Sequence, residues 1–253
     1  MTQDTRKDPQ FEAERRRDLD AMGADTDFAR QTRDWIGKAQ ELRYSYQFDW
    51  LGLPIIQYPQ DIVAMQELVW ALKPDLIVET GIARGGSAIF YASLLELNAI
   101  CGGPQDAEIV AIDIDIRAHN RAAIDSHPLA RRLTMIEGSA IDADVVAQVH
   151  AKAKGKSSVL VCLDSNHTHD HVLEELRAYA PLVTPDSYIV VFDTLVEELP
   201  PAAIGERPWG PGDNPMTAVH AYLRENDGFA IDTDRHTRLQ ITVAKNGYLR
   251  RQR

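Results

Sequence analysis

Short apolar runs alternate with amphipathic stretches through the middle of this chain. The apolar runs, which we interpret as strands, occupy 76–80, 108–114, 133–137, 158–164 and 187–193. Between them, apolar residues recur at helical spacing, which predicts helices over 86–97, 117–125, 142–153 and 169–180. Strands separated by helices favour a parallel sheet with right-handed crossovers. The pattern therefore predicts an α/β fold.

The N-terminal part of the chain lacks this alternation. Residues 1–45 are polar and helix-prone, so we expect a helical arm or lid that precedes a single domain over residues 46–253. Residues 61–72 have apolar positions at helical spacing, and Lys73-Pro74 is expected to end that helix.

The C-terminal part predicts a change in strand direction. Residues 199–215 are rich in proline and predict a long, stiffened loop at the carboxyl edge of the sheet. After a helix at 215–226, apolar runs at 228–232 and 239–244 are separated by a short polar link. Such a link is too short for a crossover helix, so we expect these two strands to be antiparallel.

Charge and cysteine content narrow the classes of partner. The net charge of −11 argues against nucleic acid or an anionic membrane as the main partner. Cys101 and Cys162 form no disulfide or zinc pattern, which favours a reducing compartment. No apolar run is long enough to cross a bilayer and the N-terminus has no signal region, so we expect a cytoplasmic protein.

The first strand runs into a glycine-rich turn and then a helix, which is typical of a nucleotide-binding βα unit. Gly81, Gly85 and Gly86 allow close approach of a ligand to the backbone. A dinucleotide site has a glycine where this chain has Glu79, and a carboxylate there repels a pyrophosphate. A carboxylate instead attracts the cationic S-adenosylmethionine, which we prefer to NAD.

Acidic and small polar residues end the next two strands. Ligands of open α/β sheets bind beyond the carboxyl ends of the strands. Asp113, or failing that Asp115, is placed to accept hydrogen bonds from ribose hydroxyls, and Glu137-Gly138-Ser139 suits the adenine edge. The structural alternative for Asp113 is a carboxylate that caps the helix near Arg117.

The fourth and fifth strands both end in an aspartate. If these strands are neighbours, Asp164 and Asp193 lie about 5 Å apart and need a cation or a shared proton between them. Carboxylate oxygens suit Mg²⁺, and Thr194, Asn166 or water are candidates for a further ligand. The alternative is that both aspartates cap the helices that follow.

Three histidines follow Asp164 at a spacing that suits neither a helix face nor common zinc sites. His167 stands closest to the strand end, so we expect it to act as a general base. His169 and His171 are expected at the start of the next helix. The alternative for His167 is a structural side chain in a loop.

Together these residues resemble the cephalosporin hydroxylase family, a group of S-adenosylmethionine- and Mg²⁺-dependent methyltransferases that includes rhamnosyl O-methyltransferases. The resemblance covers roughly residues 45–250 and rests on five segments: Glu79-Thr80-Gly81 with Arg84-Gly85-Gly86-Ser87, Asp113-Ile114-Asp115, Glu137-Gly138-Ser139, Asp164-Ser165-Asn166-His167 and Val191-Phe192-Asp193. Some relatives carry two adjacent acids at the last of these, so a metal site here is expected to be weaker or completed differently.

The resemblance implies a Rossmann-like class I methyltransferase fold, with a mostly parallel seven-stranded sheet that ends in an antiparallel C-terminal strand pair. The expected metal ligands are Asp164, Asp193 and Thr194, with His167 as the catalytic base. The residues expected to bind S-adenosylmethionine are Glu79, Gly81, Arg84, Gly85, Ser87, Asp113, Ile114, Ser139 and Asp164.

The expected activity is O-methylation of a hydroxyl, on a deoxysugar of a small glycoside or glycolipid, by a possible homo-oligomer. Two alternatives stay open: a non-catalytic partner protein of antibiotic biosynthesis, and an NAD-dependent oxidoreductase.

Overall fold

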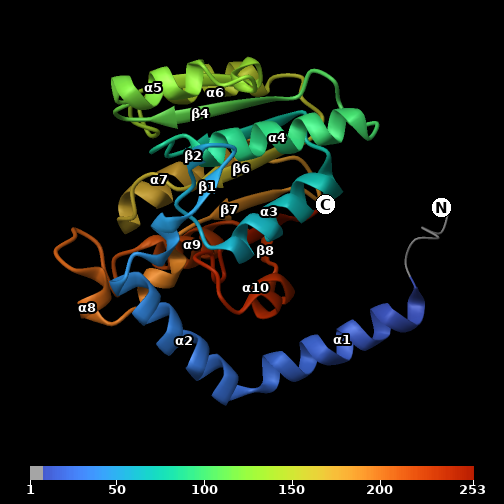
Figure 1. The fold of residues 1–253 in the computed structure, drawn as a ribbon, viewed down its shortest axis with the longest axis vertical. Coiled ribbons are helices and arrows are strands. Elements are labelled where there is room, and N and C mark those ends of the chain that lie inside the picture. The colour runs from blue at the N-terminus through green and yellow to red at the C-terminus, as the bar shows by residue number, and fades with distance from the viewer. Residues whose placement is uncertain (1–7) are drawn as a thin grey trace.

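The computed structural model describes residues 8–253, so the first seven residues of the expected arm lie outside the described range. Its centre is a seven-stranded sheet with the strand order β5-β4-β3-β6-β7-β9-β8 (Figure 1). Strands β3 to β7 are parallel to one another, whereas β9 is antiparallel to both β7 and β8. The strands are β3 (Leu76–Thr80), β4 (Glu108–Asp113), β5 (Leu133–Glu137), β6 (Val159–Leu163), β7 (Tyr188–Val191), β8 (Phe229–Ile231) and β9 (Tyr248–Arg251). The expected α/β fold, with its antiparallel C-terminal pair, is confirmed.

Two apolar layers sandwich this sheet because alternate strand residues face opposite sides. On β3, Ile77 packs with one layer, and Leu76 and Val78 pack with the other. Burying each such side chain contributes roughly 1.5–3 kcal/mol. The first layer comes from α3 (Pro59–Leu72), α4 (Gly86–Ile100) and α5 (Ala118–Asp125), and the second from α6 (Ala143–Ala153), α7 (His169–Tyr179) and α9 (Pro215–Glu225).

Local sequence signals set the bounds of these helices. Helix α3 begins at Pro59, whose fixed φ suits the first helical turn. It ends at Lys73, which adopts a left-handed φ of 45° just before Pro74. Asn214 and Thr217 form a capping box that starts α9.

The arm consists of α1 (Pro9–Ala24) and α2 (Thr26–Glu41), with Asp25 capping α2. It runs beside the domain (Figure 1), where α1 contacts α10 (Thr233–Leu239) and α2 contacts α8 (Pro201–Ile204). Helix α2 buries Ile36 and Ala39, whereas α1 buries no residue. No described helix combines the length and the apolar character needed to cross a membrane.

Short elements complete the chain. A hairpin of β1 (Asp49–Trp50) and β2 (Leu53–Pro54) follows η1 (Tyr44–Gln47). The other 3₁₀ turns are η2 (Ala130–Arg132), η3 (Ala180–Leu182) and η4 (Thr194–Glu198). The proline-rich stretch at 199–215 is a loop, as expected, interrupted by α8.

The expected strand at 239–244 is wrong, and the short polar link before it does hold a helix. The link folds into α10, and the last strand is β9, nearer the C-terminus. The backbone N–H of Val243 donates to the buried carboxylate of Asp61 instead of to a strand, and so does the hydroxyl of Thr242. A buried acid from a distant helix therefore overrides the strand propensity of this segment.

Candidate active site

The glycine turn after β3 brings the end of this strand against the end of β6. Gly81 has a φ of +91°, and a Cβ at this position would lie 2.1 Å from the backbone oxygen of Asp164. Only glycine fits such a close approach. The turn faces a small cavity of about 50 Å³, lined by Gly81, Arg84, Ser87 and Asp164 among others. Gly85, also expected at the cofactor site, caps the start of α4.

Buried acceptors without donors mark this side of the site. Glu79 is only 3% exposed, and burial raises the pKa of its carboxyl to about 8. No donor among the described residues reaches its Oε2 atom. The Oε1 atom of Gln57, which lines the small cavity, is also buried without a donor. Such orphaned acceptors fit a ligand that brings N–H or O–H donors, as the ammonium and ribose groups of S-adenosylmethionine do.

Asp113 supports the same turn. Its Oδ2 atom accepts hydrogen bonds from the backbone N–H groups of Ile82 (2.9 Å) and Ala83 (3.0 Å). It does not cap α5, whose N-cap residue Arg117 has no side-chain cap. The Oδ1 atom accepts one bond, from the N–H of Asp115, and therefore keeps capacity for a ribose hydroxyl.

The other two residues expected at the nucleoside lie at the same edge of the sheet. Ile114, directly after β4, is 74% exposed, and Ser139 lies just beyond the end of β5. Neither lines the small cavity, so they border an open surface.

Asp164, His167 and Asp193 come together because β6 and β7 are neighbours in the sheet. One candidate ligand atom of each lies within 4.8 Å of the others, and His167 Nε2 is 3.0 Å from Asp193 Oδ2. Burial and the negative charges of Asp193 and Glu79 raise the pKa of Asp164 well above its usual range. A hard divalent cation would relieve this repulsion, and the two carboxylates, with water completing the coordination shell, are a donor set that fits Mg²⁺.

The remaining candidates have other partners. Thr194 is fully buried, and its hydroxyl donates to the backbone oxygen of Lys245 at 2.6 Å, so the structure does not bring it into the acidic group. Asn166 Oδ1 accepts from the N–H and hydroxyl of Thr168. His169 and His171 lie in the first turn of α7, bonded to Thr217 and Ser165 respectively.

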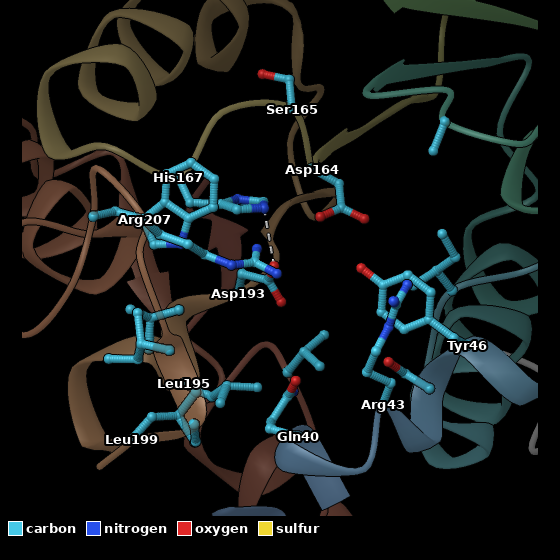
Figure 2. A pocket seen from close by; sticks show the side chains of 18 residues that line it. Gln40, Arg43, Tyr46, Asp164, Ser165, His167, Asp193, Leu195, Leu199 and Arg207 are labelled. Atoms are coloured by element: carbon cyan, nitrogen blue, oxygen red, sulfur yellow. Dashed lines mark ion pairs between the residues drawn. The ribbon is translucent and has the colours of Figure 1, made fainter. Parts of the chain in front are cut away.

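A larger cavity of about 480 Å³ opens in front of the acidic group. Figure 2 shows Asp164, His167 and Asp193 at one end, with Gln40, Arg43 and Tyr46 on a second wall and Arg207 on a third. The proline-rich loop at 199–215 contributes Trp209, whose ring meets the His167 imidazole edge-on, with 4.8 Å between the ring centres. We call this space the acceptor cavity.

Eight described residues other than glycine have a positive φ, and three of them line the acceptor cavity. Three of its lining residues that are not glycine have left-handed backbones: Arg43 (φ 54°), Ala83 (φ 46°) and Asp193 (φ 53°). Each such conformation costs of order 1 kcal/mol or more and persists where the surrounding structure imposes it. Strain of this kind is typical of functional sites.

Sequence reasoning missed several residues of both cavities. Gln57 had one weak signal, because it is the polar residue in an apolar stretch between two prolines. Gln40, Arg43 and Tyr46 belong to the arm and its junction, and Arg207 belongs to the loop, where no periodicity shows which side chains point inward.

Comparisons with known proteins agree with this arrangement. A model of the rhamnosyl O-methyltransferase/CmcI family matches residues 42–252. The chain is 29% identical over 206 residues to the rhamnosyl O-methyltransferase of Mycobacterium tuberculosis (strain ATCC 25618 / H37Rv), with 79% of this chain and 76% of that protein covered. Identity to the rhamnosyl O-methyltransferase of Mycobacterium leprae (strain TN) is 29% over 204 residues, with 79% and 81% covered.

Solved structures share the fold. A structure of CmcI with Mg and SAM superposes with a TM-score of 0.56 at 18% identity, covering 81% of this chain and 77% of that one. An O-methyltransferase from Bacillus cereus in complex with SAH has a TM-score of 0.51 at 14% identity, covering 79% and 81%. The family match spans most of the chain, and the chain therefore belongs to the rhamnosyl O-methyltransferase/CmcI family.

Proposed function

We propose that this protein is an S-adenosylmethionine- and Mg²⁺-dependent O-methyltransferase that acts on a sugar hydroxyl, of the rhamnosyl type, in a small glycoside or glycolipid. The observation that carries the proposal is the convergence at one sheet edge of the buried Glu79, whose Oε2 atom has no donor among the described residues, and the Asp164–His167–Asp193 group, beside a cavity large enough for a sugar. The rhamnosyl O-methyltransferases of Mycobacterium and the Mg-SAM structure of CmcI support it.

The residues around the two cavities have two proposed roles, cofactor binding and metal binding. Glu79, Gly81, Ser87 and Asp113, with Arg84, Gly85, Ile114 and Ser139, would hold S-adenosylmethionine, which supplies the methyl group when bound. Asp164 and Asp193 would hold Mg²⁺, which lowers the pKa of a bound hydroxyl.

His167 is the proposed general base. A carboxylate only accepts hydrogen bonds, so Nε2 of His167 donates to Asp193 and Nδ1 of the neutral ring keeps its lone pair. Nδ1 would take the hydroxyl proton, which leaves the acceptor oxygen free to bond to the methyl group. S-Adenosylmethionine would supply that methyl group and leave as S-adenosylhomocysteine. The walls of the acceptor cavity hold the hydroxyl in line, so much of the rate enhancement comes from positioning.

Mass spectrometry of a rhamnoside panel incubated with enzyme and S-adenosylmethionine, with Mg²⁺ or with EDTA, tests the proposal. We expect a single added methyl group only with Mg²⁺. His167→Asn should lower turnover by about 100-fold or more, because it removes the general base, and should leave the affinity for S-adenosylhomocysteine unchanged.

His220→Asn is the matched control, since His220 is exposed on α9. Full turnover of the His167 variant would refute the base assignment, and full turnover in EDTA would refute the metal. A thermal shift with NADH but not with S-adenosylhomocysteine would favour an oxidoreductase instead.

A further inference from the structure

Two arginines extend into the acceptor cavity from opposite sides. Arg43 comes from the junction between the arm and the domain, and Arg207 comes from the loop between α8 and α9 (Figure 2). Each guanidinium lies near an aromatic ring, Arg43 4.1 Å from the ring centre of Tyr46 and Arg207 5.3 Å from that of Trp209. Such stacking holds a guanidinium in place while its N–H groups stay free to bind a partner.

Neither arginine has a carboxylate partner among residues 8–253, although the protein has a net charge of −11. Elsewhere on the described surface, arginines form ion pairs readily, as Arg177 does with Glu225 and Arg250 with Asp186. The two carboxylates that face the cavity, Asp164 and Asp193, are the pair that fits a divalent cation. Once a cation offsets that pair, both guanidinium charges in the cavity remain uncompensated.

The backbone also holds one of these arginines in an unfavourable conformation. Arg43 caps η1 with a left-handed φ of 54°, a conformation that favours glycine or asparagine. An exposed arginine that lines the acceptor cavity stands at this position instead.

We propose that the acceptor carries an anionic group, a carboxylate or a phosphate, which Arg43 and Arg207 bind from the two sides of the acceptor cavity. The inference rests on the proposed transfer to a sugar hydroxyl and adds the chemical class of the acceptor. Planar guanidinium groups bind both anions through paired N–H···O hydrogen bonds, so the two sources share one recognition chemistry. The site then recognises two features of its acceptor, a hydroxyl near His167 and a negatively charged group bound by the two arginines.

Matched probes test this inference by binding as well as by turnover. The probes are phenyl α-L-rhamnoside, its 4-carboxyphenyl analogue and rhamnose 1-phosphate, each titrated calorimetrically into protein loaded with S-adenosylhomocysteine and Mg²⁺. We expect at least one anionic probe to bind about 10-fold or more tighter than the neutral one, with the preference weakening as ionic strength rises. Whichever anionic probe binds with the higher affinity shows whether the anionic group of the acceptor is a carboxylate or a phosphate.

Variants assign the preference to the two arginines. The double variant Arg43→Met, Arg207→Met should bind all three probes with equal affinity, while the corresponding lysine variants should retain part of the preference. Arg33→Met is the matched control, because Arg33 is an exposed arginine of the arm that lines a different cavity.

Equal affinity for neutral and anionic probes would overturn the inference, and so would a preference that survives the double variant. A loss of S-adenosylhomocysteine affinity in the double variant, without a change in probe binding, would assign the arginines to the cofactor carboxylate instead. If the anionic probes bind through the arginines but no rhamnoside is methylated, the proposed rhamnosyl acceptor is wrong. The binding of an anion by the two arginines would still be supported.

Discussion

At the scale of single residues, Glu79 combines two properties that the site needs. It is the penultimate residue of strand β3, beside the glycine turn, and its carboxyl is buried without a full set of donors. In the absence of a cationic ligand, the protonated form is favoured because burial raises its pKa to about 8. An S-adenosylmethionine ammonium would favour the ionised form, so ligand and acid stabilise each other.

The raised pKa of Glu79 predicts a pH dependence of stability in the ligand-free protein. Its folded pKa of about 8 lies above the ordinary value of 4.5, so between these pH values the folded state holds a proton that the unfolded chain has lost. Stability therefore falls as pH rises through that window, by up to about 5 kcal/mol from this group. Glu79→Gln stays neutral and should be the more stable protein at pH 8 but not at pH 5, as measured by urea unfolding.

Glu206→Gln is the control, because Glu206 is exposed and forms no ion pair among the described residues. Asp61, whose pKa burial raises to about 6, contributes to the slope of both proteins, so the difference between wild type and the Glu79 variant isolates Glu79. A difference that stays constant from pH 5 to pH 8 would contradict a raised pKa.

The residues that the sequence located are those fixed by topology. Glu79, Asp113, Asp164 and Asp193 stand at or just after strand ends, and parallel strands bring their carboxyl ends to one edge. Arg43 depends on a turn conformation that its own sequence disfavours, so propensity could not locate it.

At the scale of elements, the segment 242–245 connects α3 to the metal-binding side of the site. The carboxylate of Asp61, in the first turn of α3, accepts from the Thr242 hydroxyl, the Val243 N–H and the Tyr248 hydroxyl. The same segment accepts from η4, where the Thr194 hydroxyl donates to the backbone oxygen of Lys245. Because η4 follows Asp193 directly, this network of hydrogen bonds helps to fix the position of Asp193 in the acidic group.

Asp61→Asn should weaken these hydrogen bonds and make the position of Asp193 less well fixed. The amide supplies one acceptor oxygen instead of two and places an NH₂ group where an acceptor is needed, so a buried donor is left unsatisfied at a cost of about 1–3 kcal/mol. We expect lower stability in urea and weaker Mg²⁺ binding by calorimetry, with S-adenosylhomocysteine affinity retained.

Asp106→Asn, in an exposed loop, is the control for the same chemical change. Unchanged Mg²⁺ affinity together with lower stability would show that the network supports the fold but not Asp193. The same contacts explain why the apolar run at 239–244 was mistaken for a strand. Its β-branched residues fit a strand, but the N–H of Val243 and the hydroxyl of Thr242 donate to a carboxylate on a helix far away in sequence, which no local window reveals.

At the scale of the whole molecule, the sheet carries the cofactor side and the arm completes the acceptor side. The alternation of strands and helices was enough to predict the sheet, since each element follows from its own periodicity. The packing of the arm was not predictable, because α1 buries no residue and its polar sequence does not define a face. Helix α2 differs, since it buries Ile36 and Ala39 and leads to Gln40 and Arg43 in the acceptor cavity.

Two truncations separate these contributions. Removing residues 1–24 deletes α1 together with its ion pair from Arg16 to Asp234. This pair is exposed, and exposed ion pairs contribute little to the free energy of unfolding. We expect that protein to unfold at nearly the same urea concentration as the full chain and to keep its acceptor KM. Removing residues 1–43 also deletes buried side chains and one wall of the acceptor cavity, so stability should fall and the acceptor KM should rise about 10-fold or more.

Both truncated proteins should bind S-adenosylhomocysteine with wild-type affinity, because the residues proposed to hold it start at Glu79. Urea unfolding, calorimetry and methyl-transfer kinetics report the three quantities separately. Loss of S-adenosylhomocysteine binding in the shorter truncation would show that the arm stabilises the cofactor side as well. An unchanged acceptor KM in the longer one would mean that the loop carrying Arg207 and Trp209 forms the acceptor site without the arm, so the anion would be bound from one side of the cavity only.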